Sequence, residues 1–579
     1  MNHTRTHEVL RKSAEAGIEP SQGVFDTPSY FGIRIGFWLL GICLAVFEAW
    51  TNRYFVTADA VSYMDMSDGV LHGQDWHRLI NGTWSPLYPT VLGVFRRIFA
   101  PSALQEIAFD HILNIAIFLF AFASFEFLLS SIDRELVSPR SPQRVPLPRW
   151  VFLTLGYSLF IWASISQITL ESLRPDMLMS GFLYLAVALL VGMRGGHSTL
   201  GSHVVLGAVL GVSYLAKAPM LPIGVVILAA SVLIGPNWRR ALPLAACSGI
   251  VFFLIGSLYF VPLSRSRGHF TAGESGKFNY ILYADRASPT WYLTNPGSAA
   301  GTPLHRTRQI VAKPATYEFS IGISITHPLR FDPSYWTEGL KPVFGLRNQL
   351  RAVKQNLTVY LHIFIELGGM VLGFLILCCS CYLGSLGSRL ARDLMEGWPL
   401  WIVGAAGVIL YAPIHVEPRY VGAFFVLLWL GLLIGIRAWR TDKRFLEGVV
   451  VAVALSLLIS TARAAYLPMR LRWNPRSNMD AEVARELPQY GIRPGEKVAR
   501  ISTAGDLGWA RASRVTVVAE VDLDDAETFW RSDPATQIEV LRALRKTGVR
   551  CVVAHVWGDV TAQGWFRLAQ THYWIYPFQ

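Results

Sequence analysis

The stretch TADAVSYMDMSDG, residues 57 to 69, follows directly after the first long apolar run of the chain. It carries three carboxylates, Asp59, Asp65 and Asp68. When residues 59 to 71 are placed on a helix at about 100° per residue, the apolar side chains form one stripe, and Asp65 and Asp68 fall on the opposite face. The pattern predicts an amphipathic helix along a membrane surface, with Asp59 at its N-terminal end and the other two aspartates in water.

The composition around this stretch is that of a membrane protein. Of the 579 residues, 52% are hydrophobic and only 16% are charged, whereas about a quarter of the residues are charged in an average soluble protein. The net charge of +12 is explained by basic cytoplasmic loops and does not indicate a nucleic-acid partner. Apolar runs of about 20 residues, long enough to cross a bilayer, predict eleven spans: 31–50, 107–129, 149–168, 176–194, 203–217, 219–234, 241–263, 357–384, 397–414, 419–437 and 445–462.

The fifth and sixth spans form one apolar run that is interrupted by Lys217-Ala218-Pro219. Proline breaks the helical hydrogen-bond ladder, and a lysine in the centre of a bilayer is costly. We therefore expect two short helices that meet at the aqueous surface.

Arginine and lysine are enriched in alternate short loops, which predicts that residues 1–30 are cytoplasmic. The odd number of spans then puts the C-terminus on the extracytoplasmic (periplasmic) side of the inner, or plasma, membrane. The membrane domain is predicted over residues 31–462, with two large outer loops at 51–106 and 264–356.

The tail, residues 463–579, differs in character from the rest. EKVARIS, RVTVVAEV and VRCVVAHV are short β-branched runs typical of strands. The segment DPATQIEVLRALRKTG lies between two of them and reads as an amphipathic helix that ends at Gly548. The expected fold is thus an all-α polytopic membrane protein with a small C-terminal α/β domain outside the membrane.

Asp59 has two interpretations at this stage. An aspartate at the start of a helix can be its N-cap. A carboxylate at the aqueous edge of the bilayer can also be a general base, which takes a proton from a hydroxyl acceptor while the other reactant stays in the lipid.

Several short motifs in order along residues 30 to 460 resemble a known family. They are ADAVSYMDM with Asp59 and Tyr63, then PLYP (86–89), ESLRPDML (171–178), YLAKAPML (214–221) and HVEPRYV (415–421). The set resembles the GT-C-fold integral-membrane glycosyltransferases, in particular the bacterial branch related to protein O-mannosyltransferases and lipid A aminoarabinose transferases. The tail lies outside the resemblance.

The resemblance implies a polyprenyl-phosphate sugar as donor, an inverting displacement, and Asp59 as the base. The acceptor is a glycan, a lipid or a protein. The departing phosphate calls for a cation, and Arg419, Lys217 and Arg174 are the candidates, although each can also be an interfacial residue that extends its charge to water.

Further residues accompany these candidates. Glu417 can orient Arg419, His415 can contact phosphate, and Glu171 and Asp176 flank Arg174, although each also fits a solvated or structural role. Trp84 and Tyr88 can stack on a sugar or acceptor, or belong to the aromatic belt of the membrane. The supporting set is Tyr63, Asp65, Glu171, Asp176, His415, Glu417 and Tyr420.

Two departures from the family pattern bear on the chemistry. The lysine motif reads Lys-Ala-Pro rather than Lys-Gly-Pro, and no Asp-x-Asp or Glu-x-Asp pair follows the first span. The missing pair argues against a metal-bridged diphosphate donor, so neither a divalent metal nor another cofactor is expected.

Two other functions remain open. A transporter or flippase would use Lys217, Arg174 and Arg419 as substrate contacts, but transporters usually show paired broken helices, and the chain has one broken run. A non-catalytic envelope assembly protein that presents the tail domain is the third possibility.

Overall fold

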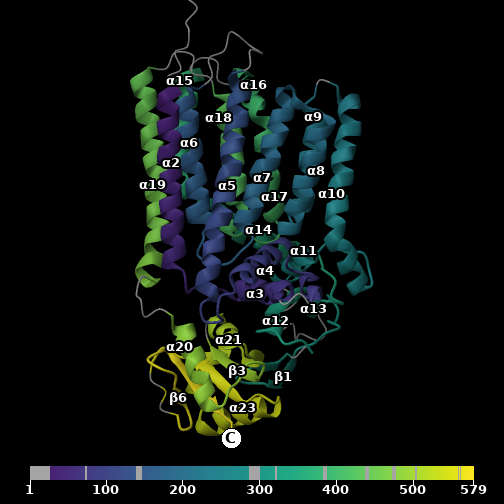
Figure 1. Ribbon diagram of the computed structural model, residues 1–579, viewed down its shortest axis with the longest axis vertical. Helices are drawn as coiled ribbons and strands as arrows, with labels where there is room; N and C mark the ends of the chain where they lie inside the picture. Colours follow the sequence, from purple (N-terminus) through teal and green to yellow (C-terminus); the bar gives the residue numbers. More distant parts are fainter. Residues whose placement is uncertain are drawn as a thin grey trace, which may run out of the picture.

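A computed structural model describes most of the chain. The residues described are 27–71, 75–137, 147–235, 237–285, 300–319, 322–382, 388–436, 442–472, 478–502, 505–558, 560 and 562–578. Most of these residues are helical, and the strands are concentrated near the C-terminus (Figure 1).

Long apolar helices form the larger part of the molecule. They are α2 (Thr27–Thr51), α5 (Glu106–Val137), α6 (Arg149–Trp162) with a π-helical extension (Ala163–Ile168), α7 (Asp176–Gly192), α8 (Leu200–Ala216), α9 (Met220–Leu233), α10 (Trp238–Arg267), α14 (Leu346–Glu366), α15 (Gly368–Tyr382), α17 (Trp398–Tyr411), α18 (Pro418–Gly435) and α19 (Lys443–Arg472). Among the described residues, eight helical stretches are long and apolar enough to cross a membrane, and a bent pair adds a ninth span. With the shorter helices α8 and α9, all eleven predicted spans coincide with helices, and the multi-pass fold is confirmed.

One predicted span is divided in the structure, and one predicted break between spans is confirmed. The predicted span 357–384 is divided between α14 and α15, which are bent by 67° at a break after Glu366. The predicted break at Lys217 is confirmed, because α8 ends at Ala216 and α9 starts at Met220. Lys217 itself has an extended backbone (φ −157°, ψ 130°).

Short helices at one end of the bundle cover the ends of the spans (Figure 1). They are α3 (Ala58–Leu71), α4 (Leu87–Phe99), α11 (Ser275–Asn279), α12 (Pro328–Phe331) and α13 (Pro333–Trp336). Both large loops and the tail therefore lie at the same end of the molecule. The extracytoplasmic orientation of that end stays a prediction.

The tail forms an α/β unit, as its sequence predicts. Its strands are β3 (Lys497–Ser502), β4 (Thr516–Val521), β5 (Cys551–His555), β6 (Phe566–Arg567) and β7 (Tyr573–Pro577), and its helices are α20 (Met479–Glu486), α21 (Gly508–Ala512), α22 (Ala526–Arg531) and α23 (Pro534–Lys546). The amphipathic α23 is capped by Asp533, which accepts a hydrogen bond from the Thr536 amide (3.0 Å), and Gly548 ends the helical turn with φ +81°.

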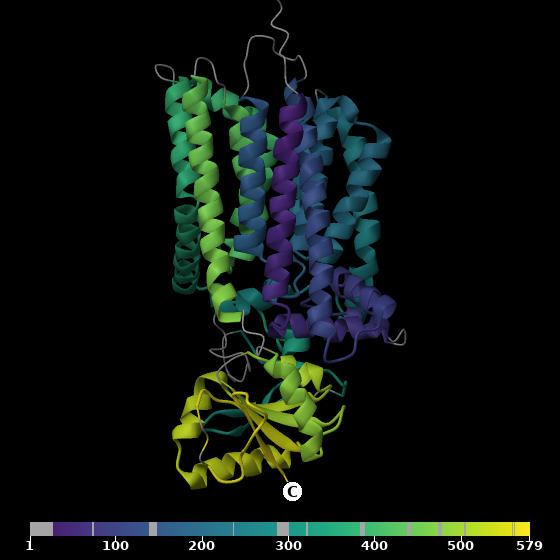
Figure 2. The same cartoon turned by 60° about the vertical axis from the view of Figure 1, so that its left-hand side comes forward.

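The sheet of the tail also recruits the second large loop. Strands β1 (Arg308–Val311) and β2 (Thr316–Glu318) extend it, in the order β1-β2-β4-β3-β5-β7-β6. Only β4-β3-β5 are parallel, and β2 pairs antiparallel with β4. The sequence-based division into a loop and a separate tail did not include this pairing. Figure 2 shows the resulting unit below the bundle, with α20 and α21 on the side toward the spans.

Candidate active site

Helix α3 carries the three aspartates of the opening stretch, but Asp59 does not cap it. Thr57 precedes the helix, and its hydroxyl oxygen accepts a hydrogen bond from the Ala60 amide (3.4 Å). Asp59 lies inside the first helical turn. Its carboxylate is therefore not needed to satisfy the helix start and is available for another role.

The partner of Asp59 is Arg419, in the first turn of α18. Nη2 of Arg419 lies 3.3 Å from Oδ2 of Asp59, and Nε donates to Oε2 of Glu417 (2.6 Å). Nη2 also donates to the Tyr420 hydroxyl (3.2 Å). The Arg419 side chain is 12% exposed and the Asp59 side chain 28%. The two charges thus meet at the edge of the buried region and remain accessible to a ligand.

Lys217 reaches the same cluster through Asp176, the first residue of α7. Its ammonium group makes an ion pair with Oδ1 of Asp176 and lies 4.1 Å from the centre of the Tyr420 ring. The second oxygen of Asp176 has no hydrogen-bond partner and lies 4.0 Å from Nη1 of Arg419. Lys217 and Arg419 therefore flank one buried carboxylate and one aromatic ring.

His415 and Glu417 complete this side of the cluster. Nε2 of His415 lies 3.3 Å from Oε1 of Glu417, and the imidazole stacks on Tyr283 at a centroid distance of 3.8 Å. Burial raises the pKa of the Glu417 carboxyl, but the hydrogen bond from His415 and the Arg419 charge outweigh it and hold that pKa below its usual value. Glu417 is therefore expected to be ionised in its contact with Arg419, and its role in orienting that side chain stays a prediction.

A cavity of about 240 Å³ opens beside these residues. It lies between the start of α9, the segment around α11 and the end of α17, and most of its surface is apolar. Tyr420 and His415 belong to both the cavity wall and the charged cluster. The remaining wall residues include Pro219, Leu221, Pro222, Leu410, Tyr411 and Ile414.

Other predicted site residues lie outside this cluster or are buried. The closest ionic partner of Arg174 is Glu171, at 3.7 Å. Tyr88 is fully buried and donates to Asn114 (3.0 Å), and it packs edge-on against the buried Tyr63. Trp84 is partly buried and donates to the Arg330 carbonyl (3.3 Å). In this conformation Tyr88 supports α3 and α5 and has no surface for stacking on a sugar.

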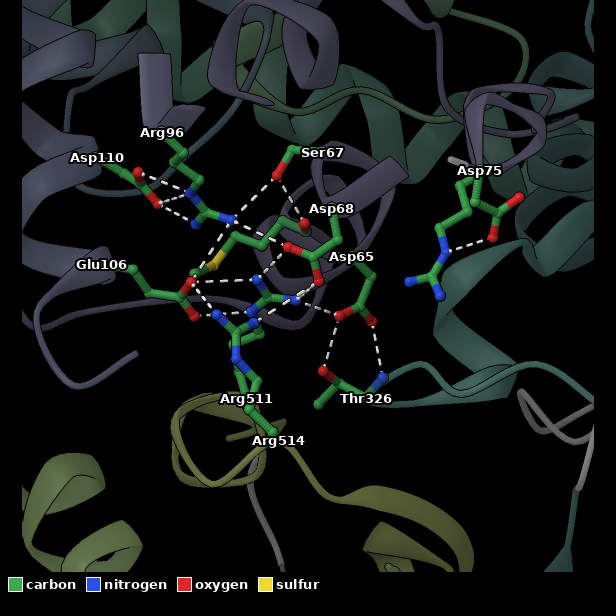
Figure 3. A network of polar contacts seen from close by, with 12 residues as sticks. Asp65, Ser67, Asp68, Asp75, Arg96, Glu106, Asp110, Thr326, Arg511 and Arg514 are labelled. Carbon is green, nitrogen blue, oxygen red and sulfur yellow. Dashed lines mark hydrogen bonds and ion pairs between the residues drawn. The ribbon is translucent and has the colours of Figure 1, made fainter. Parts of the chain in front are cut away.

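The prediction that Asp65 and Asp68 face water is wrong. Asp65 is 2% exposed and accepts hydrogen bonds from the amide and hydroxyl of Thr326 (2.9 and 2.8 Å). Asp68 makes a bidentate pair with Arg511 of the tail (2.6 and 2.7 Å). Figure 3 shows both carboxylates pointing toward Arg511 rather than away from the molecule. A loop and the tail cover the face of α3 that periodicity assigned to solvent.

Sequence reasoning also missed Arg511 and Tyr283, and no local motif marks either residue. Asp176 was expected beside Arg174, but it pairs with Lys217, which is distant in sequence. Within the described part of the chain, no group of three or more His, Cys, Asp or Glu side chains is arranged to hold a metal ion. Independence from metal stays a prediction.

No model of a known protein family matches the chain, and no curated protein sequence does either. Among solved structures, the chain is similar to ArnT from Cupriavidus metallidurans in the apo state, with 12% identity, a TM-score of 0.50, and coverage of 94% of this chain and 98% of that one. The same protein bound to undecaprenyl phosphate gives 13% identity, a TM-score of 0.50, and coverage of 94% and 97%. An Archaeoglobus fulgidus oligosaccharyltransferase in the apo form gives 12% identity, a TM-score of 0.49, and coverage of 92% of this chain and 70% of that one.

At these identities the similarity concerns the fold. It covers nearly the whole length of this chain and of ArnT, so the tail is included as well as the spans. The chain therefore has the GT-C fold that its motifs predicted, with a C-terminal α/β unit at one end of the bundle.

Proposed function

We propose that this protein is an inverting glycosyltransferase that moves a sugar from a polyprenyl-phosphate donor to a hydroxyl acceptor on the outer face of the membrane. The observation that carries the proposal is the contact of Asp59 with Arg419 at 3.3 Å, at the end of the bundle where the spans meet the loops. The proposed base and the proposed phosphate-binding cation are thereby adjacent. The GT-C fold supports the proposal, and ArnT, which has this fold, has been solved with undecaprenyl phosphate.

Arg419 and Lys217 are the residues proposed to hold the donor phosphate. A guanidinium binds phosphate through two parallel hydrogen bonds, and an ammonium adds a point charge. Both cations lie over the ring of Tyr420, at 4.1 and 5.0 Å, and Tyr420 lines the apolar cavity of about 240 Å³. An isoprenoid chain in that cavity would place its phosphate against the two cations.

The charge balance of the cluster suggests how donor binding would affect Asp59. Asp59, Asp176 and Glu417 are three carboxylates, and Arg419 and Lys217 are two cations. An incoming phosphate competes with Asp59 for Arg419. Donor binding would thus release the carboxylate from its ion pair and leave it free to accept a proton, next to the sugar.

The proposed step is a single displacement. The acceptor oxygen attacks the anomeric carbon, Asp59 takes the hydroxyl proton, and the bond from the anomeric carbon to the phosphate oxygen breaks. The bonding electrons leave with the polyprenyl phosphate, whose charge Arg419 and Lys217 stabilise. Because attack and departure occur on opposite faces, the configuration at the anomeric carbon is inverted.

The test is Asp59→Asn, assayed for sugar transfer from a labelled polyprenyl-phosphate sugar. Transfer should fall roughly 10²–10⁴-fold, the usual contribution of a general base. Thr57, not Asp59, caps α3, so the thermal stability should not change. Donor affinity should be retained or improved, because the competitor for Arg419 becomes neutral.

The matched control is Asp75→Asn. Asp75 lies in the same loop and pairs with Arg78 on the surface (2.9 Å), so its replacement should leave transfer intact. Transfer by Asp59→Asn within a few-fold of the parent would refute the role of Asp59.

A further inference from the structure

A buried arginine of the tail packs against α3 and the start of α5. Arg511, in α21, is 2% exposed, and its guanidinium contacts three carboxylates. Nη1 lies 2.8 Å from Asp65 and 2.6 Å from Asp68, and Nε lies 2.8 Å from Glu106, at the start of α5. Figure 3 shows Arg511 and Arg514 approaching these carboxylates from the tail.

The charges on the membrane side of this contact are unbalanced without the tail. Asp65, Asp68, Glu106 and Asp110 are buried or nearly so. The membrane side offers this group Arg96, which pairs with Asp110 and lies 3.8 Å from Asp68 and 3.6 Å from Glu106 (Figure 3). The tail adds Arg511 and also Arg514, whose Nη2 lies 2.9 Å from Glu106. Buried carboxylates left without a cation are strongly destabilising.

Arg511 also acts on the pKa of the carboxylates that it contacts: it lowers the pKa of Asp65 and Asp68, although at Asp65 burial outweighs it and the pKa stays raised. Burial alone raises the pKa of Asp68, but the charge of Arg511 and its hydrogen bonds lower that pKa to about 2. The two tail arginines, together with Arg96, therefore keep Asp68 ionised at neutral pH. The same helix, α3, carries Asp59 six residues before Asp65, a rise of about 9 Å along the axis.

We propose that Arg511 is a positioning residue: by docking the tail on Asp65, Asp68 and Glu106, it fixes α3 and thereby holds Asp59 against Arg419. This inference rests on the proposed function for the role of Asp59, but its structural part does not. The tail is then a required component of the catalytic centre. The donor phosphate, held by Arg419 and Lys217 outside α3, is bound independently of it.

The first test is hydrogen exchange in the full-length protein, which needs no substrate. In Arg511→Gln, amide exchange over residues 58–71 should accelerate, whereas exchange in α18 and α7 should match the parent. Arg531→Gln is the matched control, because Arg531 is an exposed tail arginine whose ionic partner is Glu527 (2.7 Å). Unchanged exchange over 58–71 in Arg511→Gln would overturn the proposal, and so would equal loss of protection throughout the spans.

The second test separates positioning from donor binding. Arg511→Gln should lower kcat for sugar transfer by roughly 10²-fold, the size expected for a misplaced catalytic group, with affinity for polyprenyl phosphate within about twofold of the parent. Adding Asp68→Asn removes one uncompensated charge and should restore part of the loss, which a double-mutant cycle measures. An equal loss of donor affinity and kcat would identify Arg511 as a general fold stabiliser and refute positioning.

Milder variants keep the test decisive if Arg511→Gln does not fold. Arg511→Lys retains one charge, and Arg514→Gln removes a partly exposed contact. Both should show the same separation of kcat from donor affinity at smaller amplitude, and its absence in both would overturn the proposal. If the parent transfers no sugar, the proposed function fails, whereas exchange over residues 58–71 still decides whether Arg511 fixes α3.

Discussion

Replacement of Arg419 is the sharpest test of the phosphate site. Its guanidinium is held by Glu417 through Nε and by Asp59 and Tyr420 through Nη2. The side chain is therefore pre-oriented, and little rotamer entropy remains to be lost when phosphate binds. Arg419→Gln removes the charge. Arg419→Lys keeps the charge but removes the planar set of donors that can make two parallel hydrogen bonds to phosphate.

The magnitude follows from the contacts that are lost. A hydrogen bond to a charged group contributes about 1.5–3 kcal/mol, and each 1.4 kcal/mol is about tenfold in Kd. In Arg419→Gln the carboxylates of Asp59, Asp176 and Glu417 also keep only Lys217 as a cation and repel the phosphate. We expect Kd for polyprenyl phosphate to rise roughly 10²-fold in Arg419→Gln and roughly tenfold in Arg419→Lys.

The assay is equilibrium binding of polyprenyl phosphate to the purified protein in nanodiscs. Arg53→Gln is the control, because Arg53 lies at the same end of the bundle, above the Trp50 and Tyr54 rings (4.3 and 4.6 Å). That variant changes the charge at the membrane surface by the same amount but should bind the lipid normally. A Kd within twofold of the parent in both Arg419 variants would refute the site and redirect attention to Lys217.

Two further predictions concern topology and pH. In a cysteine-free background, Glu539→Cys should react with an impermeant thiol reagent in whole cells, whereas Asp442→Cys should be shielded; shielding at 539 would contradict an extracytoplasmic tail. Burial and the nearby Asp506 raise the pKa of Asp480 from 3.8 to about 7, so the folded tail binds a proton more tightly than the unfolded chain, and stability should fall as the pH rises from about 4 to about 7. Asp480→Asn should flatten this part of the curve of Tm against pH, and an unchanged curve would exclude Asp480 as its source.

The pattern of apolar and polar residues was sufficient to predict those elements whose structure depends on neighbours in the sequence. An apolar run long enough to cross a bilayer is expected to be helical, because a helix satisfies the backbone hydrogen bonds within the segment when it lies in lipid. The break at Lys217 was equally readable, since proline and a charge act locally. The β-branched runs and α23 of the tail were also found, because strand and helix periodicities are properties of short segments.

The helix at residues 58–71 shows the limit of the same reasoning. Periodicity placed it correctly and put Asp59 near its start, but it assigned Asp65 and Asp68 to water. A periodicity states which side chains share a face, not what covers that face. Here Thr326 and Arg511, hundreds of residues later in the chain, cover it.

The spans, the presence of a tail unit, and the kinds of residue at the membrane edge could all be inferred from the order of residues alone. The tertiary structure alone decided that Asp176 pairs with Lys217, that Asp59 faces Arg419, and that two strands of a distant loop complete the sheet of the tail. The physical reason is that a charge or a strand edge requires a partner but carries no local signal of which partner it will meet. That choice is made by long-range packing, which brings together segments far apart in the chain.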